Sequence, residues 1–211
     1  MGDYMFKIEK KIIKNELEYK GAVILKYEIE YPQVYSIHYD TKKFNDFNLS
    51  KVIKLENYAK NTMFSDAKNT YDYNVSQGFP IMVYELVLKT YVTYNQEPFL
   101  SLYQDEYTFT GGAHGSTIRT SQNWNFEYGF QFSLSDIFYD NPNYILCILK
   151  DINKQISEKR ADNYFDDYCS LILDTFNPSQ FYLNPYSVIV YFQQYDIAPY
   201  SSGIPTFEVS C

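Results

Sequence analysis

The stretch Tyr107-Thr-Phe-Thr-Gly-Gly-Ala-His-Gly-Ser116 sets three glycines and one of the chain's two histidines between two runs that alternate apolar and polar residues. Glycine adopts positive φ angles without steric cost, so Gly111 and Gly112 predict a tight hairpin connection between two strands. Small residues also let a partner approach the backbone closely, and loops often carry binding sites. At this point two roles stay open for His114: it bonds a nearby carbonyl, or it faces a ligand.

The runs around this stretch predict a β-meander, because their alternation has the period of two that is typical of half-buried strands. Residues 81–95 and 98–110 are expected to pair across the turn Asn95-Gln-Glu-Pro98. A third strand is expected to start near Ser116. The glycine-rich stretch therefore connects the second and third strands.

Further strands are predicted outside the meander. A strand over residues 22–31 is expected to end at Pro32, and a shorter one to follow over residues 34–39. Near the C-terminus, strands are expected over residues 187–192 and 206–209.

Two segments change to the helical period. In the first, residues 44–68, one face carries Val52, Leu55, Ala59 and Met63. In the second, which follows Asn141-Pro-Asn143, the apolar stripe consists of Ile145, Ile148, Leu149, Ile152 and Ile156. Because strands and helices occur in blocks, the sequence predicts the α+β class, with antiparallel sheets and two main helices packed on them.

The composition predicts a globular chain. With 211 residues, 19% of them aromatic, the chain can bury a sizeable core, and it has neither a repeat period nor a low-complexity segment. No linker divides it. We expect an N-terminal β-rich portion with one helix over residues 1–96 and a C-terminal portion with one main helix over residues 97–211, packed intimately as one unit.

The net charge of −8 argues against nucleic acid as a partner, because phosphate binding needs a clustered basic face. A basic protein partner fits the sign of the charge better. No apolar run is long enough to span a membrane, and the first eight residues lack the apolar core of a signal peptide. The chain is therefore expected to be extracytoplasmic or at the cell surface if an upstream signal or anchor has been removed, and otherwise cytoplasmic.

The three cysteines, Cys147, Cys169 and Cys211, cannot all pair within one chain, and their spacing contains no CxxC motif. Cys147 is expected to pack in the core as a small apolar side chain. A Cys147–Cys169 bridge remains an alternative in an oxidising compartment. The sequence leaves the redox state of all three open.

Candidates for catalysis are few, and we predict no catalytic residue, metal ligand or cofactor. The sequence contains no HExxH, GxSxG, phosphate-binding loop or dinucleotide fingerprint. A zinc site from His38, His114 and Asp105 has no spacing in its favour. Asp105 and Glu106 are adjacent on a strand and so point to opposite faces, and the pair Asp166–Asp167 fits a helix end or loop.

A second candidate binding loop is Tyr195-Asp-Ile-Ala-Pro-Tyr-Ser-Ser-Gly-Ile204. Tyrosine, serine and glycine together form an adaptable recognition surface at low conformational cost. The tyrosines could equally line the core. The predicted ligand-binding residues are thus Gly111, Gly112, His114, Gly115, Tyr195, Pro199 and Tyr200.

Four motifs together resemble one known family. They are the GGAHG stretch, Asn123-Trp-Asn-Phe126, Phe132-Ser-Leu-Ser-Asp-Ile-Phe138 and the Tyr195 to Ile204 segment, and Glu30-Tyr-Pro-Gln33 extends the resemblance to the N-terminal portion. The family is a domain of unknown function that occurs in the lysozyme-sensing anti-sigma factor RsiV and in the non-catalytic part of the peptidoglycan deacetylase PdaC. This chain has neither a sigma-binding segment nor a deacetylase domain.

The resemblance implies an extracytoplasmic binding or sensing module of the bacterial cell envelope that recognises a lysozyme-like protein or a peptidoglycan fragment. Two alternatives remain. A small cell-wall glycan hydrolase would need two carboxylates within about 10 Å of each other in a cleft. A purely structural envelope protein would lack a concave surface lined by tyrosines.

Overall fold

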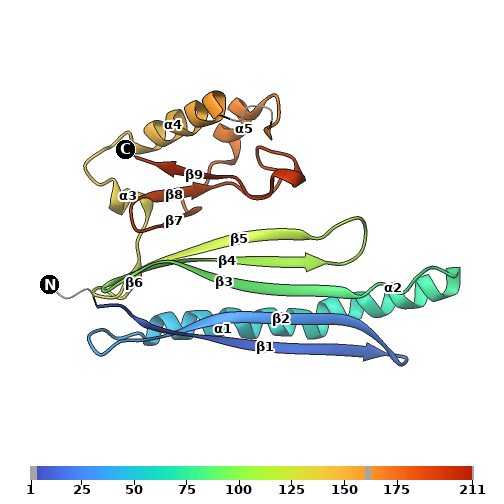
Figure 1. Cartoon of the computed structure of the whole chain (residues 1–211). Coiled ribbons are helices and arrows are strands. Elements are labelled where there is room, and N and C mark those ends of the chain that lie inside the picture. Colours follow the sequence, from blue (N-terminus) through green and yellow to red (C-terminus); the bar gives the residue numbers. More distant parts are fainter. Residues whose placement is uncertain (1–3, 160–162, 211) are drawn as a thin grey trace. The chain divides into compact units, whose positions relative to one another are not determined.

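The computed structural model describes residues 4–159 and 163–210 and confirms the α+β class (Figure 1). A six-stranded sheet has the order β1-β2-β3-β4-β5-β6, and a three-stranded sheet has the order β7-β8-β9. Helices cover parts of both sheets. One pair of neighbouring strands, β2 and β3, is parallel.

The N-terminal hairpin consists of β1 (Lys7–Tyr19) and β2 (Ala22–Tyr35). Its turn has Lys20 and Gly21 at positive φ, 50° and 81°, as a two-residue hairpin of this twist requires. The sequence did not predict β1, because its charged residues interrupt the alternation. The predicted end of β2 at Pro32 is also wrong, and residues 34–35 continue the same strand.

Pro32 is tolerated inside β2 because of where the pairing lies. Opposite β1 it pairs with Lys10, whereas β2 pairs with β3 over Leu25 to Ile29. Pro32 therefore lies outside the part of β2 that is hydrogen-bonded to strands on both sides. Only within that part would the missing N–H of a proline break a ladder. The separate strand predicted over residues 34–39 does not exist, because residues 34–35 belong to β2 and residues 36–39 form no strand.

One long helical segment returns the chain from β2 to β3. It consists of α1 (Lys42–Tyr58), the π-helical turn η1 (Ala59–Met63) and α2 (Phe64–Gln77), so it exceeds the predicted range of residues 44–68. A parallel strand pair needs such a crossover. As predicted, the buried face that packs on β2 includes Val52, Leu55, Ala59 and Met63.

The meander is confirmed. β3 (Tyr84–Gln96), β4 (Phe99–Phe109) and β5 (Ser116–Asn125) are neighbours in the sheet, and β6 (Phe130–Gln131) closes it at the edge. In β3 the alternate residues Tyr84, Leu86 and Leu88 are buried, which is the predicted period of two.

The C-terminal layer packs helices on the small sheet formed by β7 (Phe181–Leu183), β8 (Val188–Tyr191) and β9 (Thr206–Val209). The short α3 (Leu134–Ile137) precedes α4 (Tyr144–Lys159), α5 (Tyr168–Thr175) and the 3-10 turn η3 (Tyr200–Ser202). The α4 stripe is confirmed by the burial of Ile148, Ile152 and Ile156. Ile145 lies at the exposed start of that helix.

The chain forms two compact units. Unit 1 comprises Met1–Phe6, Tyr91–Tyr103 and Ile118–Cys211, and unit 2 comprises Lys7–Thr90 and Gln104–Thr117. β3, β4 and β5 contribute residues to both. The sequence-based boundary between residues 96 and 97 stays a prediction.

Candidate functional site

The glycine-rich loop belongs to unit 2 and connects β4 to β5. Gly111 and Gly112 have φ angles of 106° and 92°, so the predicted need for glycine is confirmed at both positions. His114 is exposed, and its Nδ1 donates a hydrogen bond to the Gly115 carbonyl over 3.0 Å. The predicted bond to a nearby carbonyl is present, and contact with a ligand stays a prediction.

Gly115 has a different role from the other glycines. It is buried, and a Cβ atom built on it would lie 2.4 Å from Cε2 of Tyr107 and 2.5 Å from the Thr108 carbonyl oxygen. Real Cβ atoms do not approach other atoms this closely. The third glycine is thus required by the packing of its own backbone against β4.

The second predicted loop belongs to unit 1, and its tyrosine is exposed. Tyr195 has a φ angle of 68°, which is strained for a bulky residue, and 53% of its surface is accessible. Its ring centroid lies 5.8 Å from that of the half-buried Tyr200. Pro199 precedes the 3-10 turn that begins at Tyr200.

This loop is held firmly on both sides of Tyr195. Ile197 and Ala198 are buried in the core of the C-terminal layer, and the Ile197 carbonyl accepts a bond from the backbone N–H of Phe165 over 3.1 Å. Upstream, the backbone N–H of Gln193 donates to Asp196 Oδ2 over 2.8 Å. The exposed ring is therefore presented by an ordered backbone.

Gln193 ties the Tyr195 loop to β5. The backbone N–H of Arg119 donates to Gln193 Oε1 over 2.9 Å, and Gln193 Nε2 donates to the Arg119 carbonyl over 2.8 Å. The Arg119 guanidinium lies 3.8 Å from the ring centroid of Tyr103 and 5.9 Å from that of Tyr191. Sequence reasoning missed this cation–π cluster, because nothing in the spacing of these residues indicates contact.

The predicted site residues thus fall into two groups. Gly111, Gly112, His114 and Gly115 lie together in unit 2, and Tyr195, Pro199 and Tyr200 lie together in unit 1. Each group forms one loop, as predicted.

A groove in unit 1 was not predicted. It has a volume of about 430 Å³ and is lined by nine residues. We call it the aromatic groove because five of them are aromatic; the nine are Tyr94, Phe99, Asn125, Tyr128, Phe130, Phe132, Asp136, Ile137 and Leu183. Four of these belong to the motifs that carry the family resemblance: Asn125, Phe132, Asp136 and Ile137.

Local turn chemistry shapes this groove. Between β5 and β6, the backbone N–H of Glu127 donates to Asn125 Oδ1 over 3.0 Å, and Gly129 adopts a φ of 64° and donates to the Asn125 carbonyl over 2.9 Å. At the start of α3, Asp136 Oδ2 accepts bonds from the Ser133 N–H over 2.8 Å and from its hydroxyl over 2.7 Å. This capping box holds the pKa of Asp136 below its ordinary value.

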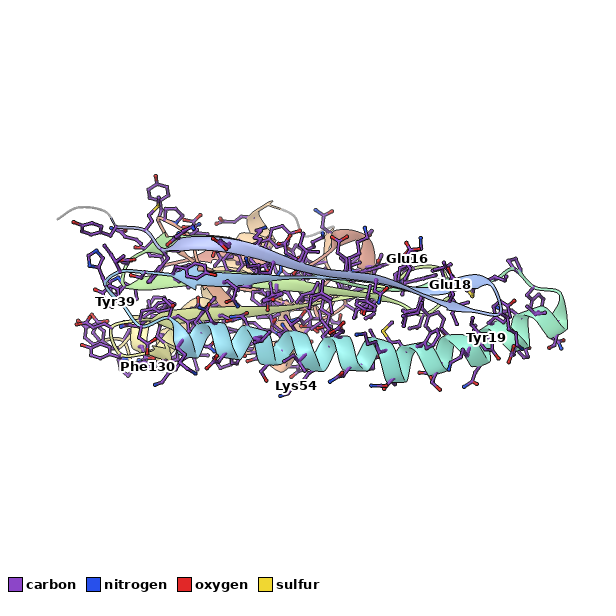
Figure 2. All side chains as sticks on the ribbon, turned by 90° about the horizontal axis from the view of Figure 1, so that it is seen from below. Glu16, Glu18, Tyr19, Tyr39, Lys54 and Phe130 are labelled. Atoms are coloured by element: carbon purple, nitrogen blue, oxygen red, sulfur yellow. The ribbon has the colours of Figure 1, made fainter. Side chains whose placement is uncertain are left out.

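A cavity of about 600 Å³ in unit 2 lies between α1 and β4 and is lined by residues that include Lys51, Lys54 and Glu106 (Figure 2 labels Lys54). Burial lowers the pKa of Lys51, and its Nζ donates to Gln104 Oε1 over 3.0 Å. Gln104 Nε2 in turn donates to Thr90 Oγ1 over 3.1 Å. This chain of bonds accounts for the polar side chains buried beneath the cavity.

The hydrolase alternative stays a prediction, and several acids line cavities of the molecule. Glu16, Glu28 and Glu85 border a small cavity in unit 2. Lys89 and Lys14 hold the pKa of Glu28 below its ordinary value, so this carboxylate is ionised at neutral pH. Asp167 is the N-cap residue of α5, as expected for a helix end. Among the residues described, no three His, Cys, Asp or Glu side chains gather as a metal site.

Cys147 is half-buried on α4 and disulfide-bonded, so the prediction that it packs in the core as a free thiol is wrong. It lies beside the Ile148 stripe and not on it. Cys169 is an exposed free thiol, and the alternative Cys147–Cys169 bridge is therefore wrong too. Cys211 lies outside the described residues.

Within the described residues, we find no helix with the length and apolar character that crossing a membrane demands.

Two family models match the chain. Residues 18–117 match a model described as deacetylase PdaC, and residues 135–211 match one described as a protein of unknown function, DUF3298. The second match contains the Tyr195 loop, and the first contains the glycine-rich loop. A comparison with curated proteins gives no match.

Two solved structures have a similar fold. A DUF3298 family member from Bacteroides fragilis is 17% identical with a TM-score of 0.70, and the alignment covers 97% of this chain and 90% of that one. A DUF3298 family protein from Pseudomonas aeruginosa is also 17% identical, with a TM-score of 0.63 and coverage of 98% and 91%. At this identity the likeness establishes the fold alone.

Proposed function

We propose that this chain is a non-catalytic binding module of the bacterial cell envelope and that its Tyr195 loop recognises a lysozyme-like protein. The cell-envelope part rests on the match to the PdaC deacetylase model and on the DUF3298 match that covers the loop. Peptidoglycan deacetylation itself is not proposed for this chain.

The observation that carries the proposal is the conformation of Tyr195. A non-glycine residue with positive φ and an exposed ring has a cost to the free molecule, and such outliers gather at binding and active sites. The buried residues Ile197 and Ala198 anchor the loop, so little entropy is lost when a partner binds. Tyrosine is also among the residues that dominate binding energy in protein interfaces.

Charge supports a protein partner of opposite sign. The net charge of −8 would speed association with a basic protein, and this contribution weakens as salt is added. An acidic glycan strand would be repelled.

We further propose that the module works outside the cytoplasm. The disulfide at Cys147 supports this, because structural disulfides persist in oxidising compartments and are rare in the cytosol.

Calorimetric titration with hen lysozyme tests the proposal, with muropeptides titrated separately. The decisive variant is Tyr195→Gly, which removes the ring and suits the positive φ angle. It should weaken lysozyme binding by about tenfold or more. Tyr186→Ala is the matched control, since Tyr186 is 95% exposed in the same unit and lies outside the loop.

Saturable one-to-one lysozyme binding that depends on Tyr195 would support the proposal. If muropeptides give binding heat and lysozyme gives none, the ligand of the module is a glycan and not a protein. The assignment to this loop is refuted if neither ligand gives binding heat. It is also refuted if Tyr195→Gly binds lysozyme as tightly as wild type does.

A further inference from the structure

We propose that the aromatic groove of unit 1 is a carbohydrate subsite that binds an N-acetylated hexosamine ring. This site is separate from the Tyr195 loop, and it would exist even if that loop bound no protein. Its volume of about 430 Å³ suits a small ligand.

The first argument is the aromatic wall. Tyr128 and Phe130 lie on the turn into β6, and their rings are nearly parallel, at 21°, with centroids 5.9 Å apart. They are 65% and 48% exposed, so two large rings are held in water side by side. Figure 2 labels Phe130, the first residue of β6. Flat exposed rings of this kind provide a surface on which the C–H face of a pyranose can stack.

The second argument is a hydrogen-bond donor within the groove. Asn125 lines the groove although it is only 8% exposed. Its Oδ1 accepts the Glu127 N–H, whereas its Nδ2 donates no hydrogen bond to any residue that the structure describes. Among the described residues, the buried side-chain atoms without a partner are Glu97 Oε2 and Gln180 Oε1, so Asn125 Nδ2 is reached by solvent and is available to a ligand.

The third argument is an acceptor in the same groove. Asp136 uses Oδ2 for both bonds from Ser133, and within the described part of the chain its Oδ1 accepts none. The carboxylate is ionised at neutral pH, because the bonds from Ser133 lower its pKa. The groove therefore offers one donor, one charged acceptor and an apolar wall.

These three features select one class of ligand. An acetamido group presents a carbonyl to the Asn125 donor and an N–H to a carboxylate, and a pyranose ring presents an apolar face to Tyr128 and Phe130. An anionic ligand would be repelled by Asp136. A polyproline peptide would meet the rings but has no internal N–H donor for Asp136, so it fits less well.

The groove is preorganised for this role. The hydrogen bonds of the Asn125 turn and of the Ser133–Asp136 capping box fix both polar groups in the free protein. Binding then costs little reorganisation.

Nuclear magnetic resonance of the full ¹⁵N-labelled chain tests the proposal, with triacetylchitotriose, cellotriose and decaproline as separate probes. Triacetylchitotriose should shift the Asn125 side-chain amide resonances and saturate. Cellotriose, which lacks acetamido groups, should have an affinity that is lower by about tenfold or more.

Two variants probe the groove and one controls for exposure. Phe130→Ala removes the stacking surface, and Asn125→Asp keeps the Oδ1 acceptor of the turn but removes the donor. Each should weaken triacetylchitotriose binding by about tenfold or more, whereas Tyr186→Ala should bind as wild type does. If the amide resonances of residues outside the groove have the same positions in each variant as in wild type, folding is intact.

The proposal is overturned if triacetylchitotriose causes no shift up to about 10 mM, if decaproline alone binds, or if both variants bind like wild type. Tyr195→Gly separates this site from the proposed protein-binding loop. It should leave sugar binding unchanged, so either site can fail without the other.

Discussion

Replacing Gly115 by alanine tests whether the GGAHG stretch is built for packing. The added Cβ would lie 2.4 Å from the Tyr107 ring and 2.5 Å from the Thr108 carbonyl, about 1 Å inside ordinary contact. One of these neighbours is backbone, which cannot swing aside as the end of a flexible chain can. Overpacking of this kind costs about 1–3 kcal/mol of unfolding free energy.

For a chain of this length, such a loss lowers the melting temperature by roughly 2–12 °C. Urea unfolding followed by circular dichroism measures the free energy, and calorimetry measures the temperature. His114→Ala is the matched control: it changes the neighbouring exposed residue and should stay within about 0.5 kcal/mol of wild type.

Gly112→Ala separates backbone strain from packing. Its φ is 92° and nothing lies within 4 Å of its Cβ position, so the cost should come from the left-handed backbone alone, about 1–2 kcal/mol. Wild-type stability of Gly115→Ala would refute the packing argument. If His114→Ala kept its stability but lost a ligand, the stretch would have a binding role as well.

Three further predictions concern other parts of the chain. Thr90→Val keeps the shape of a buried side chain but removes its bonds to Gln104 and the Glu30 carbonyl, so urea unfolding should show a loss of about 1–3 kcal/mol. Under native conditions a thiol reagent should label Cys169, and Cys147 should be labelled only after reduction; mass spectrometry of the peptides decides, and immediate labelling of Cys147 would contradict the disulfide. Because Lys89 and Lys14 lower the pKa of Glu28 in the folded state from 4.5, its contribution to stability is present above pH 4.5 and is lost as the pH falls below it. Glu28→Gln should flatten that part of the stability profile, and an unchanged slope would count against the ion pairs.

Much of the fold follows from local pattern. The alternation of Tyr84, Leu86 and Leu88 and the stripe of Ile148, Ile152 and Ile156 predict a strand and a helix, because each residue type must reach one buried face. The two positive-φ glycines after β4 follow from turn chemistry. The sequence failed where charge hides the period, as in β1, and where Pro32 was taken as the end of a strand that runs on past it.

The binding loops could be proposed from composition, but their roles could not. The order of residues in the GGAHG stretch does not distinguish Gly115, which packs against Tyr107, from Gly111 and Gly112, which adopt the positive φ angles of the turn. Exposure of Tyr195 and half-burial of Tyr200 are also matters of neighbours from distant parts of the chain.

By itself, the sequence determined the class of the fold, the main helices, the meander and the absence of known catalytic motifs, since these depend on residues close together in the chain. Only the tertiary structure decided that Asn125, Phe130 and Asp136 border one groove and that Gln193 holds Arg119. Such contacts join segments that local periodicity treats independently. Pairing of strands and packing of side chains set them, and both are properties of the folded chain.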